Sequence, residues 1–502
     1  MKKFFTFLFA LCIFELNAQT IDDMLKVSYQ DYEGTARFAA MGGAFGALGG
    51  DVSSIGINPA GLAVFRKHHV SFTSSLNHVY SNSDFAGVHA NNSRLYAGIS
   101  SIGAVVTLEN QGSIDWNLGI TYLKKTNFNR RTSSGSVLSE NSIIDYFSDK
   151  ANADADFFAP DYLNSYNAFF DYNPLDWDVV MAYGTHLIDW DENAYLGALN
   201  YGDRVYRQIN SSYRGSSGEM TLDVGANFND KLYAGILLGM TTLNYKHEVA
   251  YKEYAHENNS SDFDKLIYNT NLKISGYGVN CKIGIIYKPV QPVRFGLSFH
   301  SPDYFFYPYR NVEDEEDYPL IMDNLYSASL EADYKTTEMP LRDGPGGEYY
   351  LFFEKIKTPY KAVGSFAYVF GKLGLVSIDC EYADYSRIKL RGSEPTSQFN
   401  SDIKKYFKNT VNLRFGTEIW IKNFAVRAGY MYNQSPDKDY DLSRQTCSAG
   451  FGCKFKQFNI DLAYIHTNAG DYYTHYAEAG RISESLKNRR LSLTLGWTFD
   501  ND

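Results

Sequence analysis

The sequence predicts an all-β transmembrane β-barrel of 14 antiparallel strands, with an N-terminal helical and loop plug inside its lumen. Three observations support this prediction. The 502 residues include 41 Tyr, 34 Phe and 40 Gly, a composition typical of short alternating strands with aromatic girdles. Apolar and polar residues alternate repeatedly from residue 70 onward. Very short turns also alternate with long polar connections, a pattern typical of barrels in outer membranes.

The alternation is clearest in three segments, where apolar residues point to one side and polar or small residues to the other. The apolar sets are Cys447, Ala449, Phe451, Cys453 and Phe455; Leu491, Leu493, Leu495, Trp497 and Phe499; and Val411, Leu413, Phe415, Thr417, Ile419 and Ile421. A soluble β-sandwich would show the same alternation, so this pattern does not distinguish the two folds. The alternation of short and long connections favours the barrel.

The spacing predicts 14 strands. They lie near 70–80, 95–109, 115–127, 218–228, 231–246, 272–288, 293–301, 360–370, 373–385, 410–421, 424–433, 445–455, 458–467 and 490–499. The short turns are 229–230, 288–292, 371–372, 422–423 and 456–457, and the long connections include 128–217 and 302–359. Counting residues 178–187 as a fifteenth strand would give an odd number of strands. We therefore assign them to a short helix in an external loop.

The N-terminus reads as a secretory signal peptide, residues 1–18. Lys2 and Lys3 precede an apolar run, and Ala18 offers a small residue for cleavage. A membrane anchor is the alternative, but the apolar run is too short for one. No later stretch approaches the roughly 18 apolar residues of a transmembrane helix.

Charge and cysteine content exclude further classes. The formal net charge is −11, so the chain is a poor nucleic-acid binder. Cys447 and Cys453 lie in one strand, roughly 20 Å apart and beyond disulfide reach. We interpret these two residues, with Cys281 and Cys380, as apolar wall positions.

Residues 36–65 are rich in Gly and Ala and nearly free of charge. The run Asn58-Pro59-Ala60-Gly61-Leu62 ends any preceding helix. Asp51, Ser53 and Ser54 are suited to begin a short helix. Such a segment fits a buried environment better than a solvated one.

Three motifs resemble the FadL/TodX family of long-chain fatty acid transport proteins. They are AAMGGAF (39–45) with NPAGL (58–62), FGLSFHSP (295–302) and RFGTEIWIKNFAVRAGYMYNQSP (414–436). The matches occur in the family's order over most of the mature chain. The long insertions at 128–217 and 302–359 depart from the family pattern and leave the substrate open.

The resemblance implies an N-terminal plug, residues 19–66, folded back inside a barrel formed by residues 67–502. Its candidate plug residues are Gly42, Gly43, Asn58, Pro59, Ala60 and Gly61. The glycines would let the backbone pack closely against the wall. The plug either moves when ligand arrives or is an inert stopper that stabilises the barrel. In the family, ligand leaves sideways through a kinked third strand; here that strand is 115–127, with Gly119 as the kink.

The alternation also predicts which charged residues face the lumen. A fatty acid needs an apolar slot and cationic donors for its carboxylate, and Arg suits that role. The candidates are Arg294, Arg414 and Arg427, together with His300. The alternative is that these arginines pair across the lumen with Asp379, Glu381 or Glu418, because charges inside a barrel are usually neutralised.

We find no catalytic, metal or cofactor motif and expect no enzyme activity. The expected function is uptake of hydrophobic small molecules, most specifically long-chain fatty acids, by passive diffusion past the plug. The expected partners are the outer-membrane lipid bilayer and a hydrophobic ligand. The alternative is a non-transporting structural or secretion-associated barrel that docks other outer-membrane proteins.

Overall fold

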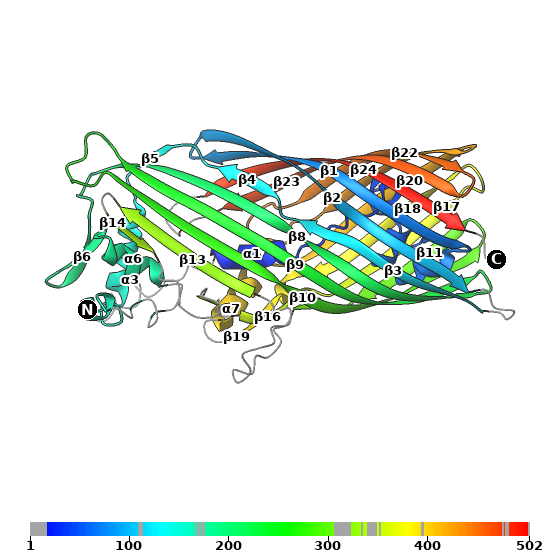
Figure 1. The fold of residues 1–502 in the computed structure, drawn as a ribbon, viewed down its shortest axis with the longest axis horizontal. Helices are drawn as coiled ribbons and strands as arrows, with labels where there is room; N and C mark the ends of the chain where they lie inside the picture. Colours follow the sequence, from blue (N-terminus) through cyan, green and yellow to red (C-terminus); the bar gives the residue numbers. More distant parts are fainter. Residues whose placement is uncertain are drawn as a thin grey trace, which may run out of the picture.

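The computed structural model describes residues 18–108, 114–165, 168, 172, 176–305, 323–332, 335–338, 349–350, 353–392, 396–473, 476 and 481–499. Long tilted strands wrap a cylinder in Figure 1, and the helices α3 and α6 lie at one end of it. Apart from Ala18, the predicted signal peptide lies outside the described residues, as do parts of the connection 302–359.

Fourteen strands form a closed ring, and each pairs antiparallel with two neighbours. They are β1 (His68–Phe85), β2 (Val88–Leu108), β3 (Ile114–Asn127), β8 (Val205–Phe228), β9 (Leu232–Ala255), β10 (Lys265–Val290), β11 (Val293–His300), β17 (Lys361–Val369), β18 (Gly374–Asp384), β20 (Asn409–Ile421), β21 (Phe424–Asn433), β22 (Arg444–Phe455), β23 (Phe458–Tyr473) and β24 (Ile482–Phe499). The ring closes where Val70 of β1 lies opposite Trp497 of β24. The predicted 14-stranded barrel is confirmed.

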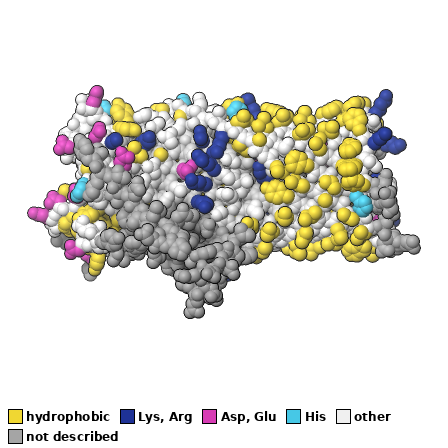
Figure 2. Space-filling model, in the orientation of Figure 1, with side chains coloured by type: hydrophobic (Ala, Val, Ile, Leu, Met, Phe, Trp, Pro, Cys, Tyr) yellow, Lys and Arg dark blue, Asp and Glu magenta, His cyan; other side chains and the backbone are white. Residues whose placement is uncertain are grey.

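Side chains alternate between the outside and the lumen along these strands. Phe451 and Leu493 are exposed on the outer wall, whereas Thr494 and Ser492 are buried inside. In Figure 2 apolar side chains cover the half of the barrel nearer the short turns. Within the described residues, Cys281, Cys380, Cys447 and Cys453 are free. Period-2 patterning therefore separates a lipid-compatible exterior from a polar interior.

Several strands run past their predicted bounds toward the long connections. β8 begins at Val205, although residue 218 was predicted, and β9 continues to Ala255. In these extensions many of the outward residues are polar or charged, as Arg214 and Glu248 illustrate. The apolar signal thus ends while the hydrogen-bonded pairing continues, which is why the sequence underestimates the strand length.

A small helical subdomain occupies the connection between β3 and β8. It contains α3 (Ile143–Ala153), α4 (Pro160–Leu163), α6 (Trp177–Gly184) and the hairpin β6 (Ile188–Asp191) and β7 (Ala194–Gly197). Ser142 and Asp145 form a capping box that begins α3. The buried side chains of Phe147 and Trp177 belong to its core. The helix predicted at 178–187 is confirmed as α6.

Short elements extend the wall at the long-connection end. They are β4 (Arg130–Ser133), β5 (Val137–Ser139), β12 (Tyr304–Phe305), β13 (Asp323–Ala332), β14 (Lys335–Glu338), β15 (Tyr349–Tyr350), β16 (Phe353–Lys357), η3 (Tyr385–Arg387), β19 (Lys389–Gly392) and α7 (Thr396–Tyr406). β13 continues the sheet beside the upper part of β10.

The N-terminal segment contains α1 (Ala18–Ser28), α2 (Ala36–Ala40), and the 3-10 helices η1 (Val52–Gly56) and η2 (Pro59–Val64). Asp51 caps η1 by accepting a hydrogen bond from the Ser53 amide at 2.9 Å, as predicted. Asn58 caps η2 by accepting from the Ala60 amide at 3.1 Å. Local capping thus breaks this segment into short pieces.

We expect Gly296→Val, on the inner face of β11, to destabilise the barrel by about 1–3 kcal/mol through overpacking. A Cβ at Gly296 would lie 2.2 Å from the Gly46 carbonyl oxygen, whereas a Cβ at Gly364, on the neighbouring strand, meets nothing within 4 Å. Gly364→Val is therefore the matched control. Urea unfolding in detergent, followed by heat-modifiable mobility in gels, measures both variants, and equal stabilities would contradict the close contact.

Candidate functional site

The N-terminal segment lies against inward-facing side chains on several sides of the ring. Ser298 of β11 donates a hydrogen bond to the Ile57 carbonyl at 2.7 Å. Ser448 of β22 donates to the Ala40 carbonyl at 3.0 Å. Polar groups of the inner wall therefore satisfy backbone groups of the segment.

Three of the predicted plug residues contact the wall. Gly42 has a φ of +61°, and a Cβ there would lie 3.0 Å from the backbone of Tyr430. Asn58 donates to the Ile285 carbonyl of β10 at 3.0 Å. A Cβ at Gly235 of β9 would lie 2.3 Å from the carbonyl of Pro59. These contacts leave no room for bulkier residues.

The remaining plug residues pack within the segment or beside it. Gly43 lies against the ring of Phe38, and a Cβ at Gly61 would lie 2.6 Å from Ser54 Oγ. Ala60 is fully buried.

An ion-pair network joins the segment to the wall at Glu418 of β20. This carboxylate is 1% exposed and pairs with Arg37 of α2 at 2.8 Å. Arg427 of β21 pairs with the same carboxylate and with Asp461 of β23, the latter at 2.6 Å. The sequence left open whether Arg427 binds ligand or pairs across the lumen, and in this structure it is paired.

Arg414 of β20 is paired as well. Its guanidinium lies 2.7 Å from Glu381 of β18, and Lys361 of β17 lies 3.6 Å from the same residue. The sequence offered pairing with such carboxylates as the alternative, and the structure shows these pairs between neighbouring strands of the wall, not across the lumen. Arg414 also borders the cavity described below, so its role in ligand binding stays a prediction.

Arg294 and His300 contact the N-terminal segment directly. Arg294 donates to the Leu48 carbonyl at 2.9 Å. His300 Nε2 lies 2.7 Å from the Ile57 carbonyl oxygen. In this structure both candidates hold the segment in place.

A second buried network fixes the segment on the opposite strands. Lys125 of β3 lies 2.9 Å from Asp303 and 3.2 Å from Glu219 of β8. Lys282 of β10 lies 2.6 Å from Glu219 and donates to the Tyr32 hydroxyl at 2.7 Å. Two cations and two carboxylates therefore neutralise one another around Tyr32.

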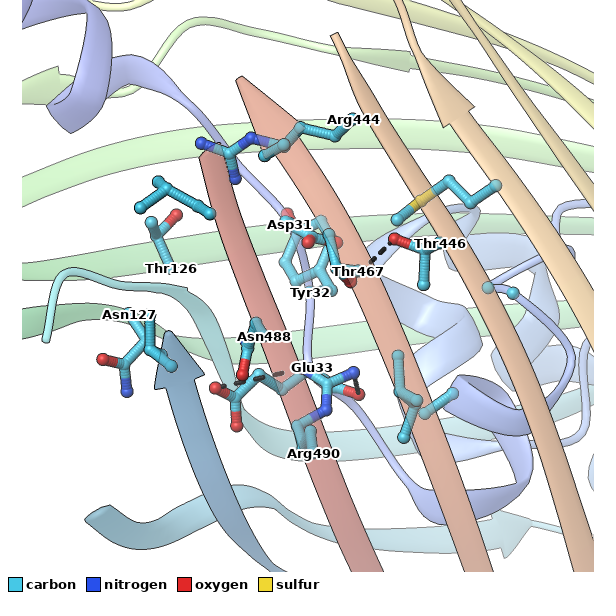
Figure 3. A pocket seen from close by; sticks show the side chains of 18 of the residues that line it. Asp31, Tyr32, Glu33, Thr126, Asn127, Arg444, Thr446, Thr467, Asn488 and Arg490 are labelled. Atoms are coloured by element: carbon cyan, nitrogen blue, oxygen red, sulfur yellow. Dashed lines mark hydrogen bonds and ion pairs between the residues drawn. The ribbon is translucent and has the colours of Figure 1, made fainter. Parts of the chain in front are cut away.

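A cavity of about 150 Å³ lies between the N-terminal segment and the wall, and Figure 3 shows it from close by. Asp31 and Glu33 come from the segment, while Arg444 and Arg490 come from β22 and β24. The apolar part of its lining includes Phe38, Val79, Met431, Ile465 and Leu486. The cavity thus combines charged groups with apolar surface.

Arg444 is the cation least compensated in this cavity. Its guanidinium lies 3.9 Å from the centre of the Tyr29 ring and forms no ion pair with a carboxylate among the described residues. Burial raises the pKa of Tyr29 to about 12, against the opposing effect of Arg444. The ring therefore stays neutral, and the charge on Arg444 faces the cavity. Asp31 also borders the cavity without pairing with Arg444.

Arg490 is only weakly paired, with 3.9 Å between its guanidinium and Glu33. Glu33 is held mainly by the hydroxyls of Ser100 and Ser75, at 2.6 and 3.1 Å. Sequence reasoning missed Arg444 and Arg490. Extending the predicted alternation back from Thr446 by two residues places Arg444 inward, and in the last strand Arg490 has the same parity as the inward Ser492.

The third strand has no gap at Gly119. This residue pairs with Val105 of β2 and with Asp223 of β8 in unbroken register. The β3–β8 pairing shifts register between Lys124 and Thr126, nearer the long connection that follows β3. Among the described residues, β3 pairs with β2 only as far as Leu123. The predicted kink at Gly119 is therefore not the irregular point of this wall.

A second cavity of about 650 Å³ opens at the short-turn end. Arg37, Glu418, Arg427 and Lys454 border it. Phe38 and its neighbours line the first cavity, while Arg37 lines the second. The N-terminal segment therefore contributes to the lining of both cavities.

A closed antiparallel ring with an apolar exterior and a polar interior defines a transmembrane β-barrel. Separately, none of the helices in the described ranges is both long and apolar enough to span a bilayer.

Solved structures share this fold, and two of them illustrate the likeness. A Pseudomonas aeruginosa FadL homologue aligns with a TM-score of 0.52 at 11% identity, covering 94% of this chain and 99% of that one. The P. putida toluene transporter TodX aligns with a TM-score of 0.51 at 13% identity, covering 94% of this chain and 100% of that one. No protein-family model and no curated protein matches the chain. At these identities the likeness establishes a common fold.

We expect Glu418→Gln to destabilise the barrel by about 3 kcal/mol, the low end for breaking a buried ion pair. The low end applies because the Arg37 side chain is 24% exposed. Urea unfolding in detergent measures the change. The control is Glu331→Gln, because the pair with Lys265 is exposed on both sides and should contribute less than about 1 kcal/mol. Equal effects of the two changes would contradict the network.

Proposed function

We propose that this protein is an outer-membrane channel that takes up hydrophobic small molecules, most specifically long-chain fatty acids, by passive diffusion. The fold it shares with a FadL homologue and with a toluene transporter supports membership of the FadL/TodX family. The observation that carries the proposal is Arg444, an unpaired cation facing a cavity with an apolar lining.

The ligand's head group would be held by Arg444 and Arg490, and its tail would lie along Met431, Ile465 and Leu486. Arginine suits a carboxylate because its planar guanidinium offers paired donors. The cavity is smaller than the roughly 300–1,000 Å³ of typical ligand pockets. It would therefore receive the head group and the start of the chain, not the whole molecule.

Residues 19–66 would act as the plug between the two cavities, after removal of signal peptide 1–18. Passage to the short-turn end requires the segment around Arg37 to move. We place the short turns in the periplasm, as in other outer-membrane barrels. If ligand leaves sideways, the irregular pairing at Lys124–Thr126 offers a better exit than Gly119.

Cells lacking the protein should take up less labelled fatty acid, and the wild-type gene should restore uptake. We expect Arg444→Gln to lower uptake about ten-fold at low substrate, because a charge-assisted hydrogen bond contributes about 1.5–3 kcal/mol. Uptake of the matching fatty alcohol should be unchanged. Asp31→Asn should raise uptake of the acid, because it removes a carboxylate from the cavity.

Arg489→Gln is the matched control, because Arg489 is exposed on the outer wall beside Arg490. Unchanged uptake in cells without the protein would reject a transport role, and a stable stoichiometric protein partner would then favour the structural alternative. Equal loss of acid and alcohol uptake in Arg444→Gln would reject the carboxylate site.

A disulfide between the segment and the wall should block transport if the plug has to move. Cβ atoms at Gly46 and Ser365 of β17 would lie 3.0 Å apart, closer than the roughly 3.5–4.5 Å of natural disulfides, so the segment has to shift by about half an ångström to form the bond. We expect Gly46→Cys/Ser365→Cys, in a background without the native cysteines, to lose uptake when oxidised and regain it when reduced. Each single variant is a control. Full uptake by the oxidised protein would show that this part of the segment stays in place.

A further inference from the structure

Three basic residues lie side by side on the outer wall of the barrel. Arg214 of β8 is opposite Lys246 of β9, and Lys246 is opposite Lys273 of β10. All three share the parity of the outward side chains on their strands. Like charges directly opposite each other destabilise a sheet. A negatively charged group outside this row would therefore stabilise it.

Two arginines widen this row. Arg131 of β4 is opposite Ser212, the next outward position on β8. Arg94 of β2 donates to the backbone carbonyl of Tyr213 at 3.0 Å, which places its guanidinium beside Arg214. We call Arg94, Arg131, Arg214, Lys246 and Lys273 the cationic patch. In Figure 2 basic side chains gather at mid-length on the face shown, beside the apolar half.

One carboxylate among the described side chains pairs with the patch. Glu248 lies 2.7 Å from Lys246 Nζ and 3.6 Å from Arg214 Nε. The side chains of Arg214, Lys246 and Glu248 are 49%, 35% and 35% exposed. A single carboxylate cannot balance five cations, so most of the positive charge points outward.

The patch borders the surface that faces lipid chains. Farther along the same outward faces, Met220 of β8, Met240 of β9 and Val279 of β10 are exposed. Hydrocarbon chains cover such a band in a membrane-spanning barrel. A molecule that covers the band and reaches the patch must be an amphiphile with a negative head group.

We propose that the cationic patch binds a lipid whose head group carries two or more phosphates. Arginine binds phosphate with paired, charge-assisted hydrogen bonds. One phosphodiester carries a single negative charge. That charge is too small to balance the net positive charge that five cations and one carboxylate leave on the patch. Continuity with the lipid-covered band favours a lipid over a soluble protein. This inference rests on the barrel fold and is independent of what the lumen transports.

Native mass spectrometry of the detergent-solubilised protein tests the proposal. The probes are cardiolipin with two phosphates, phosphatidylglycerol with one, and phosphatidylcholine as the zwitterion. We expect the wild type to bind cardiolipin about ten-fold more tightly than phosphatidylglycerol, because the second phosphate gains further charge-assisted hydrogen bonds. The triple variant Arg214→Gln/Lys246→Gln/Lys273→Gln should lose this preference. Glu248→Gln should bind cardiolipin more tightly than the wild type, a gain that misfolding cannot produce.

The matched control is Lys231→Gln/Lys372→Gln/Lys456→Gln, which removes three exposed lysines from the short turns. It should keep the cardiolipin preference. Inorganic phosphate in large excess should leave cardiolipin bound. Displacement by phosphate would identify a site for free anions instead of a lipid. An unchanged preference in the patch variant, or a lost preference in the control, would overturn the assignment.

Discussion

Closure of the hydrogen-bonded ring is the constraint on which the rest of this structure depends. Backbone groups in hydrocarbon have no water partners, so each strand must be paired on both sides, and the β1–β24 pairing removes the last free edges. Closure then forces alternate side chains into the lumen. Side chains fill an eight-stranded barrel, but fourteen strands enclose a wider space. The N-terminal segment occupies that space and satisfies its polar wall, as when the Gly46 amide donates to Asp379 at 2.9 Å.

In two of the ion-pair clusters that hold this segment, the wall carboxylate would keep a cationic partner if the segment left. Glu418 contacts both Arg37 and Arg427, so the loss of Arg37 would still leave it paired. Glu219 keeps two lysines when Tyr32 departs. Buried ion pairs contribute little net stability but are costly when one partner is removed. Shared carboxylates would therefore keep these two clusters of the inner wall paired with and without the segment, whereas Arg294 would lose its hydrogen bond to the Leu48 carbonyl.

The sequence predicts the barrel well because lipid on one side and polar groups on the other impose a strict two-residue period. Where the outside is polar, as at Arg214 and Glu248, that period is lost, so the sequence predicts β8 to begin too late and β9 to end too early. The charged lumen positions were found by parity, but their partners depend on tilt and cross-strand register. Arg444 was missed because it lies at the first position of β22, just before the predicted start. The local amino-acid composition does not predict the irregular pairing of β3 at Lys124–Thr126.

A structure of the protein with a long-chain fatty acid bound tests the central claim most directly. The account predicts density in the cavity beside β22 and β24, with the carboxylate within hydrogen-bonding distance, about 3 Å, of the Arg444 guanidinium. Ligand confined to the outer wall, or a head group placed away from both Arg444 and Arg490, would contradict it.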